Sequence, residues 1–429
     1  MMSAASSSPT PGALPPSVDH GATPRPRFDV RLAIAIVIGN LLWIAPFIAG
    51  ISVLIPARLE VIAPDQKVAI IATLATVGSF VALGANILFG ALSDRTRSRL
   101  GRRAPWMILG SAACAVSLWT ISAVESVFGL ILLWCAFQLF LNAIVAPLIA
   151  IIPDRVPEAR RGTFSAIYGI GSTLGAGAAG IVASRFVTEP RTGLIVFGVA
   201  VSLAGPLVAL IAPDRSNQDE PRMPFTRATI LHQFSFPRHG ARNFYLALFG
   251  KLFFVLAMYT VTGYQLYILT DHYGLGAVAA GAMIATIASI QTVGSLVAGT
   301  VSGPLSDKFG MRKLPVVGAA LVLAAALTVL FLWHDSVAMI VFAVFGLGLG
   351  FGVFNSVDQA LNYRVLPDPE TAAKDLGILN MANTGGQILG PLVMAFAVSS
   401  LGGYGAGFAI AAVIAVASAL AIALVRGTR

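Results

Sequence analysis

Lys251 and Asp358 are the two ionisable residues that lie well inside long apolar stretches of the sequence. A charge is costly in lipid, so each residue is a functional candidate by default. If both stretches are helices, Lys251 is about 12 Å and Asp358 about 9 Å from its nearer polar loop, at 1.5 Å per residue. Such a couple could link proton binding to a conformational change. A static ion pair and two charges facing an aqueous vestibule are the alternatives.

Amide and aromatic side chains recur at helical spacing in the same stretches. Tyr259 and Gln265 follow Lys251 by 8 and 14 residues, which places all three within one arc of a helix. Amides are costly in lipid-facing positions, so these stripes should face the interior, either to bind a ligand or to hydrogen-bond neighbouring helices. Converging amides with Trp and Tyr suit a neutral polyhydroxylated ligand. The predicted substrate-binding residues are Asn40, Trp43, Gln138, Asn142, Tyr259, Gln265 and Asn355.

The elements that must position these residues follow from composition. Of the 429 residues, 57% are hydrophobic and 11% are charged, against roughly 25% charged in soluble domains. Twelve apolar stretches each approach the roughly 20 residues with which a helix crosses a bilayer. They lie near 31–55, 68–90, 105–124, 127–151, 163–187, 193–212, 244–270, 277–302, 314–333, 337–362, 375–399 and 404–425. The sequence therefore predicts an all-α membrane protein with twelve transmembrane helices.

Basic residues fall mainly in alternate loops between those stretches. With the N-terminus inside, 23 of the 28 lysines and arginines lie in cytoplasmic segments and four outside. This bias predicts a multi-pass protein of the cell membrane with both termini cytoplasmic, and it explains the net charge of +9 without nucleic acid. Residues 1–28 are rich in Ser, Pro and Ala and have no apolar region before Arg31, which predicts a disordered cytoplasmic tail.

The two halves of the chain repeat one another. Gly90-Ala-Leu-Ser-Asp94 recurs as Gly303-Pro-Leu-Ser-Asp307, and Leu174-Gly175 recurs as Leu389-Gly390, at nearly the same offset. The predicted units are the tail 1–28, a six-helix bundle over 29–212, a cytoplasmic loop over 213–243 and a second six-helix bundle over 244–429. Many secondary transporters are duplicated in this way, with a substrate site near the midplane between the halves.

The loop after the second stretch carries the most specific motif. It reads Gly90-Ala-Leu-Ser-Asp94-Arg95-Thr-Arg97-Ser-Arg99-Leu-Gly101-Arg102-Arg103-Ala-Pro105-Trp106. This resembles the signature loop of the major facilitator superfamily, and its form is similar to that of glycoside–pentoside–hexuronide symporters and plant-type sucrose carriers. The resemblance implies the major facilitator fold and a central cavity lined by the stretches that hold Lys251 and Asp358. We therefore expect these two residues to pair in the cytoplasmic half of the cavity wall. The carboxylates of melibiose-type sodium symporters are missing between Lys67 and Asp94 and between Glu125 and Asp154.

The same loop suggests a gate. Asp94 can accept hydrogen bonds from a helix N-terminus across the interface between the halves. Arginines of the loop can pair with the acids Asp154, Glu158, Asp368 and Glu370. Such contacts would form and break in alternating access. The predicted gating residues are Asp94, Arg95, Arg102, Arg103 and Asp307, and the alternative is that the arginines only set topology.

These observations predict a secondary active transporter, not an enzyme, that works by alternating access. We expect proton-coupled uptake of a sugar or glycoside-like neutral solute. The alternative is a proton-antiport exporter of an amphipathic metabolite or drug; a transport-dead sensor would need a larger cytoplasmic domain. The expected partners are a small-molecule substrate, a coupling proton and the lipid bilayer, for a monomer without cofactor or metal. The five histidines show no metal spacing.

Overall fold

The computed structural model describes residues 28–219, 237, 241–366 and 372–426, except for the side chains of residues 159, 307, 359, 360, 363 and 372–374. Twelve helical spans in this part of the chain are long and apolar enough to cross a membrane. They coincide with the twelve predicted stretches, so the prediction of an all-α membrane protein is confirmed. Nearly all of the predicted tail, and most of the predicted loop 213–243, lie outside the described residues.

Two of the described helices begin at a side chain that satisfies a free backbone amide. The side chain of Asp29 accepts a hydrogen bond from the amide of Leu32 at 3.0 Å, and that of Ser126 accepts one from Gly129 at 3.1 Å. The first group of elements is α1 Val30–Ala49, η1 Gly50–Leu54, α2 Ile55–Ile62, η2 Pro64–Gln66, α3 Lys67–Arg95, α4 Ala104–Ala123, α5 Val127–Arg155, α6 Glu158–Ala183, η3 Ser184–Phe186, α7 Pro190–Ser202 and α8 Ala204–Ile211. The second is α10 Arg242–Thr262, α11 Gln265–Tyr267, η4 Ile268–His272, α12 Ala277–Phe309, α13 Lys313–Leu332, α14 Val337–Val341, η5 Phe342–Gly350, α15 Phe351–Arg364, α16 Ala372–Ser400 and α17 Tyr404–Ala423.

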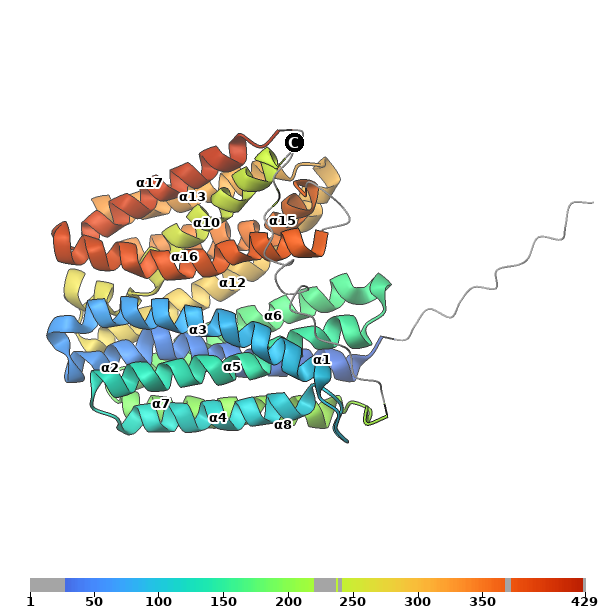
Figure 1. Ribbon diagram of the computed structural model, residues 1–429. Coiled ribbons are helices and arrows are strands. Elements are labelled where there is room, and N and C mark those ends of the chain that lie inside the picture. The colour runs from blue at the N-terminus through green and yellow to red at the C-terminus, as the bar shows by residue number, and fades with distance from the viewer. Residues whose placement is uncertain (1–27, 220–236, 238–240, 367–371, 427–429) are drawn as a thin grey trace, which may run out of the picture.

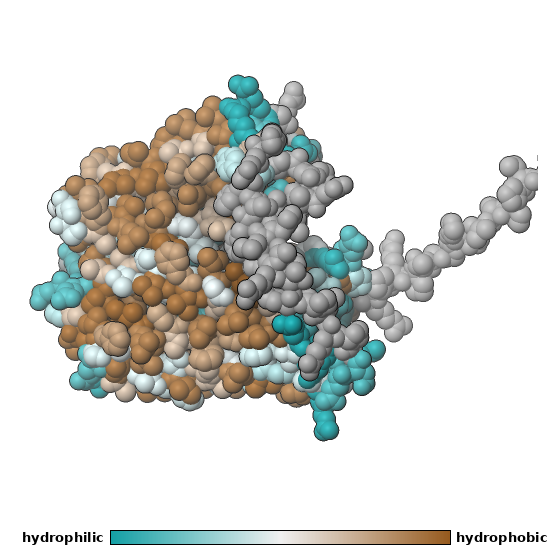
Figure 2. All heavy atoms as spheres, in the orientation of Figure 1, coloured by the Kyte–Doolittle hydropathy of each residue, from teal (hydrophilic) through white to brown (hydrophobic). Residues whose placement is uncertain are grey.

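The two groups of helices form two bundles that lie side by side (Figure 1). We call α1–α8 the N-half and α10–α17 the C-half. The halves meet where α3 packs against α16 and α6 against α12. One end of the molecule holds the loops 96–103 and 156–157, and we call it the arginine-rich end; the opposite end, with the loops 124–126 and 273–276, is the far end. On the face that Figure 2 shows, the outer surface between the two ends is mostly apolar, as a lipid-facing surface must be.

The sequence repeat corresponds to a repeated packing contact. In the N-half, a Cβ on Gly171 would lie 3.0 Å from the carbonyl oxygen of Val37, so α6 and α1 touch through their backbones. In the C-half, a Cβ on Gly386 would lie 2.7 Å from Val255, and one on Gly390 would lie 2.8 Å from the backbone of Tyr259, where α16 crosses α10. Small residues allow this close approach in membrane helices.

The helices that start each half are interrupted at comparable depth. The first span widens into a π-helical turn at Gly50–Leu54, and the span beginning with α10 breaks at Gly263 before it continues through α11 and the π-helical η4. Insertions of this kind cluster at functional sites, and paired interruptions in repeated halves point to a substrate site. Both interruptions border the cavity described next.

Candidate functional site

A central cavity of about 1080 Å³ lies between the two halves. Its lining runs from Arg161 and Gly162, at the arginine-rich end, to Ser52 and Gln265 at the interrupted helices. The volume slightly exceeds the roughly 300–1,000 Å³ usual for small-molecule pockets. Arg161 is the one charged residue among the described residues that line it. The cavity therefore offers hydrogen bonds and apolar contacts more than ion pairing.

The far end of this cavity is closed by close packing of the two halves. A Cβ on Gly177 of α6 would lie 2.1 Å from the hydroxyl oxygen of Thr292 on α12, and one on Gly180 would lie 2.3 Å from Ala288. The hydroxyl of Tyr264 is 3.0 Å from the carbonyl oxygen of Val68, across the same interface. A side chain larger than hydrogen at Gly180 would push α6 away from α12, because the Cβ of Ala288 cannot rotate out of its way.

Charges add a second contact to this closure, which we call the far-end ion cluster (Glu60, Lys67, Asp271). The Lys67 ammonium lies 2.6 Å from Glu60 in its own half and 2.8 Å from Asp271 in the other half. It also lies 4.7 Å from the centre of the Tyr267 ring. Asp271 keeps a partner in the C-half, because the Tyr404 hydroxyl donates to it at 3.2 Å. Opening the far end would thus break one pair without leaving either charge alone.

The signature loop makes its contacts within the N-half. The Arg103 guanidinium lies 2.6 Å from Asp94 and 2.9 Å from Asp154, and it donates to the Ser93 hydroxyl at 2.5 Å. Arg102 lies 2.8 Å from Asp154. The expected pairing with Asp154 is present, whereas the observed partner of Asp94 is an arginine of its own half and not a helix N-terminus of the other. The cavity lining reaches this end at Arg161 and Gly162, as an open conformation of the predicted gate requires.

Two further gating residues, Arg95 and Asp307, and two of the expected pairing acids are less informative. Arg95 is exposed at the end of α3. The side chain of Asp307, and residues Asp368 and Glu370, lie outside the described residues. The gating role of the loop stays a prediction.

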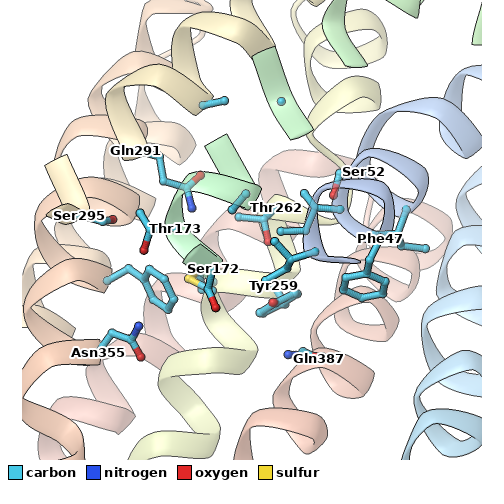
Figure 3. A pocket seen from close by; sticks show the side chains of 18 of the residues that line it. Phe47, Ser52, Ser172, Thr173, Tyr259, Thr262, Gln291, Ser295, Asn355 and Gln387 are labelled. Carbon is cyan, nitrogen blue, oxygen red and sulfur yellow. The ribbon is translucent and has the colours of Figure 1, made fainter. Parts of the chain in front are cut away.

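Four of the predicted substrate-binding residues line the cavity: Gln138, Tyr259, Gln265 and Asn355. The amides of Gln265 and Asn355 have no hydrogen-bond partner among the described side chains and backbone groups, and the cavity reaches both. Gln291 on α12 also lines the cavity and also has no hydrogen-bond partner among the described residues. Amides without protein partners in an aqueous cavity are free to bind a hydrogen-bonding ligand. Figure 3 shows Gln291, Ser295 and Asn355 together on one side of the cavity.

The other three predicted residues, Asn40, Trp43 and Asn142, are not among the described lining residues. Asn40 donates to the backbone oxygen of Tyr168 at 2.5 Å and to the hydroxyl of Ser172 at 2.6 Å, so it joins α1 to α6. Asn142 accepts from Asn86 at 3.1 Å and donates to the carbonyl oxygen of Gln138. In this conformation these two amides hydrogen-bond between and within helices, which is the structural alternative to ligand binding.

One wall of the cavity is aromatic and aliphatic, and we did not predict it from the sequence. Phe47 lies in the cavity and stacks on Trp134 with ring centres 6.1 Å apart, and Trp134 stacks on Phe137 at 5.0 Å. The Trp134 ring fits between Gly50 and Gly78, where a Cβ would approach it to 3.2 Å and 2.9 Å. The signal in the sequence was Pro46 and Gly50 on either side of Phe47, because these residues interrupt helices.

Lys251 and Asp358 form the pair that the sequence led us to expect. Their charged atoms are 2.7 Å apart, and Asn362 donates to the same carboxylate oxygen at 2.9 Å. Both residues are buried between α10 and α15 and neither is among the described lining residues, so the pair lies behind the cavity wall and not on it. One turn further along both helices, the rings of Phe254 and Phe354 stack at 3.8 Å. These rings cover the far-end side of the pair.

Comparison with known proteins agrees with this architecture. The sequence model of the Major Facilitator Superfamily matches residues 41–290 and 247–429. The chain therefore belongs to the major facilitator superfamily, a family of transporters and not of enzymes, and it is a secondary transporter. No curated protein sequence matches the chain.

Solved structures share the fold at low sequence identity. A nucleoside transporter, NupG, has a TM-score of 0.71 at 14% identity, over 93% of this chain and 100% of its own. A bacterial homologue of the human lysosomal transporter Spinster, inward-facing and occupied, has a TM-score of 0.66 at 15% identity, over 93% and 96%. A POT family transporter in complex with 5-aminolevulinic acid has a TM-score of 0.69 at 13% identity, over 92% and 95%.

Proposed function

We propose that this transporter takes up a neutral, hydroxyl-rich solute such as a sugar or glycoside together with protons. The observation that carries the proposal is the set of unpartnered amides, Gln265, Gln291 and Asn355, around a cavity whose described lining residues include no acid. Hydroxyl groups of a sugar can donate to and accept from such amides at once. The likeness of the signature loop to that of glycoside and sucrose carriers points to the same solute class.

Protons are favoured over sodium as the coupling ion. Between Lys67 and Asp94, and between Glu125 and Asp154, the chain has no carboxylate to serve a melibiose-type sodium site. Asp358 stands three residues after the lining residue Asn355, so it lies about one helical turn from the cavity. A proton on Asp358 would remove its attraction for Lys251 and loosen α10 from α15.

The charge distribution supports an orientation in the cell membrane with the arginine-rich end and both termini in the cytoplasm. On this orientation the cavity faces the cytoplasm, and the far-end contacts form the closed extracellular gate. Rocking of the two halves would open that gate and close the cytoplasmic end.

The test is uptake by the purified full-length chain in proteoliposomes. Radiolabelled neutral mono- and disaccharides are supplied under an imposed inward proton gradient, sodium gradient or no gradient. Accumulation of a saccharide under the proton gradient, and not under sodium alone, is the expected result. Absence of saccharide uptake under every gradient would refute the proposal.

A proton-antiport exporter of an amphipathic compound is the second candidate. The apolar stripe of Ile44, Phe47, Ile48 and Ile51 on the cavity wall favours it. In the same vesicles, such an exporter would extrude a hydrophobic cation such as ethidium and would show no saccharide flux.

A further inference from the structure

The cavity has two chemically different walls. One stripe of the N-half, at positions i, i+3, i+4 and i+7, consists of Ile44, Phe47, Ile48 and Ile51, with Ile71 of α3 beside them in the lining. The C-half contributes most of the amides: Gln265, Gln291, Asn355 and Gln387. In Figure 3, Phe47 stands on the opposite side of the cavity from Gln291 and Asn355. The Phe47 stripe and the amides of Gln291 and Asn355 thus lie on opposite sides of the site, and hydroxyl groups of the N-half such as that of Ser172 line it as well.

We propose that the ligand of this site is itself two-faced: a glycoside whose sugar meets the amides of the C-half and whose apolar aglycone lies against the Phe47 stripe. This inference rests on the proposed function and narrows its substrate class from sugars in general to glycosides with an apolar ring or chain. Large apolar side chains that face water cost about 25 cal/mol per Å² of exposed surface, which a ligand's apolar part would recover.

The aromatic side of the site is closely packed. Phe47 stacks nearly parallel to Trp134, at an interplanar angle of 16°, and Trp134 in turn stacks on Phe137 at 22°. Gly50 and Gly78 leave the room in which Trp134 is held. A fixed ring loses little conformational freedom when it meets a ligand, so its contact area contributes efficiently to affinity. The π-helical turn Gly50–Leu54 begins three residues after Phe47 and contributes Ile51 to this wall.

The polar side of the cavity has amide groups whose hydrogen-bonding capacity is unused. Gln265, Gln291 and Asn355 come from three different elements, α11, α12 and α15, and converge without partners among the described residues. A ligand that was apolar throughout would leave these amides without hydrogen bonds once water is expelled, at a cost of the order of 1–3 kcal/mol for each group. A free sugar would satisfy the amides but leave the stripe facing water. A two-faced ligand satisfies both walls.

The experiment compares matched glycosides on purified full-length protein by isothermal titration calorimetry. The probes are the methyl and phenyl β-glycosides of glucose, galactose and xylose. For at least one sugar, phenyl should bind about tenfold more tightly than methyl, as expected for burial of several apolar carbons. Phe47→Ala should reduce this ratio to about one while changing methyl-glycoside affinity less than about threefold. Gln291→Ala should weaken both members of the pair by a similar factor and keep their ratio.

Phe396→Ala is the matched control, because Phe396 is 56% exposed on the outer surface of α16 and should change neither affinity. Equal binding of methyl and phenyl members, or a ratio untouched by Phe47→Ala, would overturn the two-faced ligand and leave sugar transport standing. Binding of no glycoside in either form would overturn the sugar proposal and this inference together.

Discussion

At the scale of single residues, the two charged side chains that lie deep within the apolar helices of the C-half form an ion pair. Lys251 and Asp358 are 2.7 Å apart in a bundle of apolar helices, with Asn362 as a further donor and the Phe254–Phe354 stack above them. Removing one member of a buried pair leaves an uncompensated charge and typically costs 3–5 kcal/mol, whereas replacing both by apolar residues is often neutral. Structural and coupling roles can therefore be separated by comparing single and double variants.

We expect Asp358→Asn to abolish proton-driven accumulation while solute exchange across the membrane remains measurable. The double variant Lys251→Met with Asp358→Leu should recover the thermal stability that the single variant loses, yet it should still not accumulate solute. Accumulation and exchange are measured in proteoliposomes and stability by the unfolding temperature in detergent. Wild-type accumulation by either variant would show that the pair is only structural.

A second prediction at the scale of residues concerns Arg103. Its guanidinium reaches Asp94, Asp154 and Ser93 at once, and the residue is 5% exposed. A lysine cannot hold three partners in this fork geometry, so Arg103→Lys should lose at least one charged hydrogen bond, about 1.5–3 kcal/mol. We expect a clearly lower unfolding temperature for Arg103→Lys. Arg99→Lys, in the exposed part of the same loop, is the control and should leave the unfolding temperature unchanged.

At the scale of elements, α6 packs through small residues in two directions. Gly171 and Gly175 lie against α1 of the same half, and Gly177 and Gly180 lie against α12 of the other half. The first contact lies within the N-half. The second joins the two halves, so we expect it to be lost if the far end opens. The run Gly175-Ala-Gly177-Ala-Ala-Gly180 resembles a nucleotide-binding motif, but it lies within α6 and serves helix packing.

Gly180→Leu should therefore prevent closure of the far end and favour the opposite conformation. A Cβ at this position would already lie 2.3 Å from Ala288. The measurement is the distance between spin labels at Val61 and Val278, two exposed positions on either side of the far end. We expect a longer distance and loss of transport. In Gly169→Val, on the same helix but with nothing within 4 Å, the label distance should remain that of the wild type.

At the scale of the whole molecule, the halves are held together at the far end by packing and by the far-end ion cluster. If the halves separate, Lys67 keeps its ion pair with Glu60, and Asp271 keeps the hydrogen bond that the Tyr404 hydroxyl donates. The side chains of Lys67 and Asp271 are 14% and 31% exposed, so their mutual attraction is screened and is worth about 0.5–1 kcal/mol. A weak bond of this size biases the balance between two conformations without locking it, as alternating access requires.

Asp271→Asn should accordingly raise the population open at the far end by about two- to fivefold, the equivalent of that energy. The same Val61–Val278 labels report it, and a second pair at Leu100 and Phe309 reports the arginine-rich end. The two distances should change in opposite directions. Asp65→Asn removes an exposed carboxylate of the neighbouring η2 turn and should shift neither distance. One rigid arrangement at both ends, with solute or without it, would contradict alternating access in this protein.

Local and periodic properties of the sequence determined the twelve spans, the family and the pair of buried charges. Apolar length leaves a chain no option in lipid but helices, and the short loop motif is read directly from adjacent residues. The expectation that Lys251 meets Asp358 combined the cost of a lone charge in the membrane with the family resemblance, which places both helices at the central cavity.

Only the tertiary structure decided which amides face the cavity and which join helices. Asn40 and Gln265 are both amides in apolar stretches, yet Asn40 holds α6 while Gln265 lines the cavity. The difference depends on the rotation and crossing of helices from both halves, which a period of 3.6 residues cannot supply. The same holds for Phe47 and the partner of Asp94, because each is set by where two distant helices meet or separate.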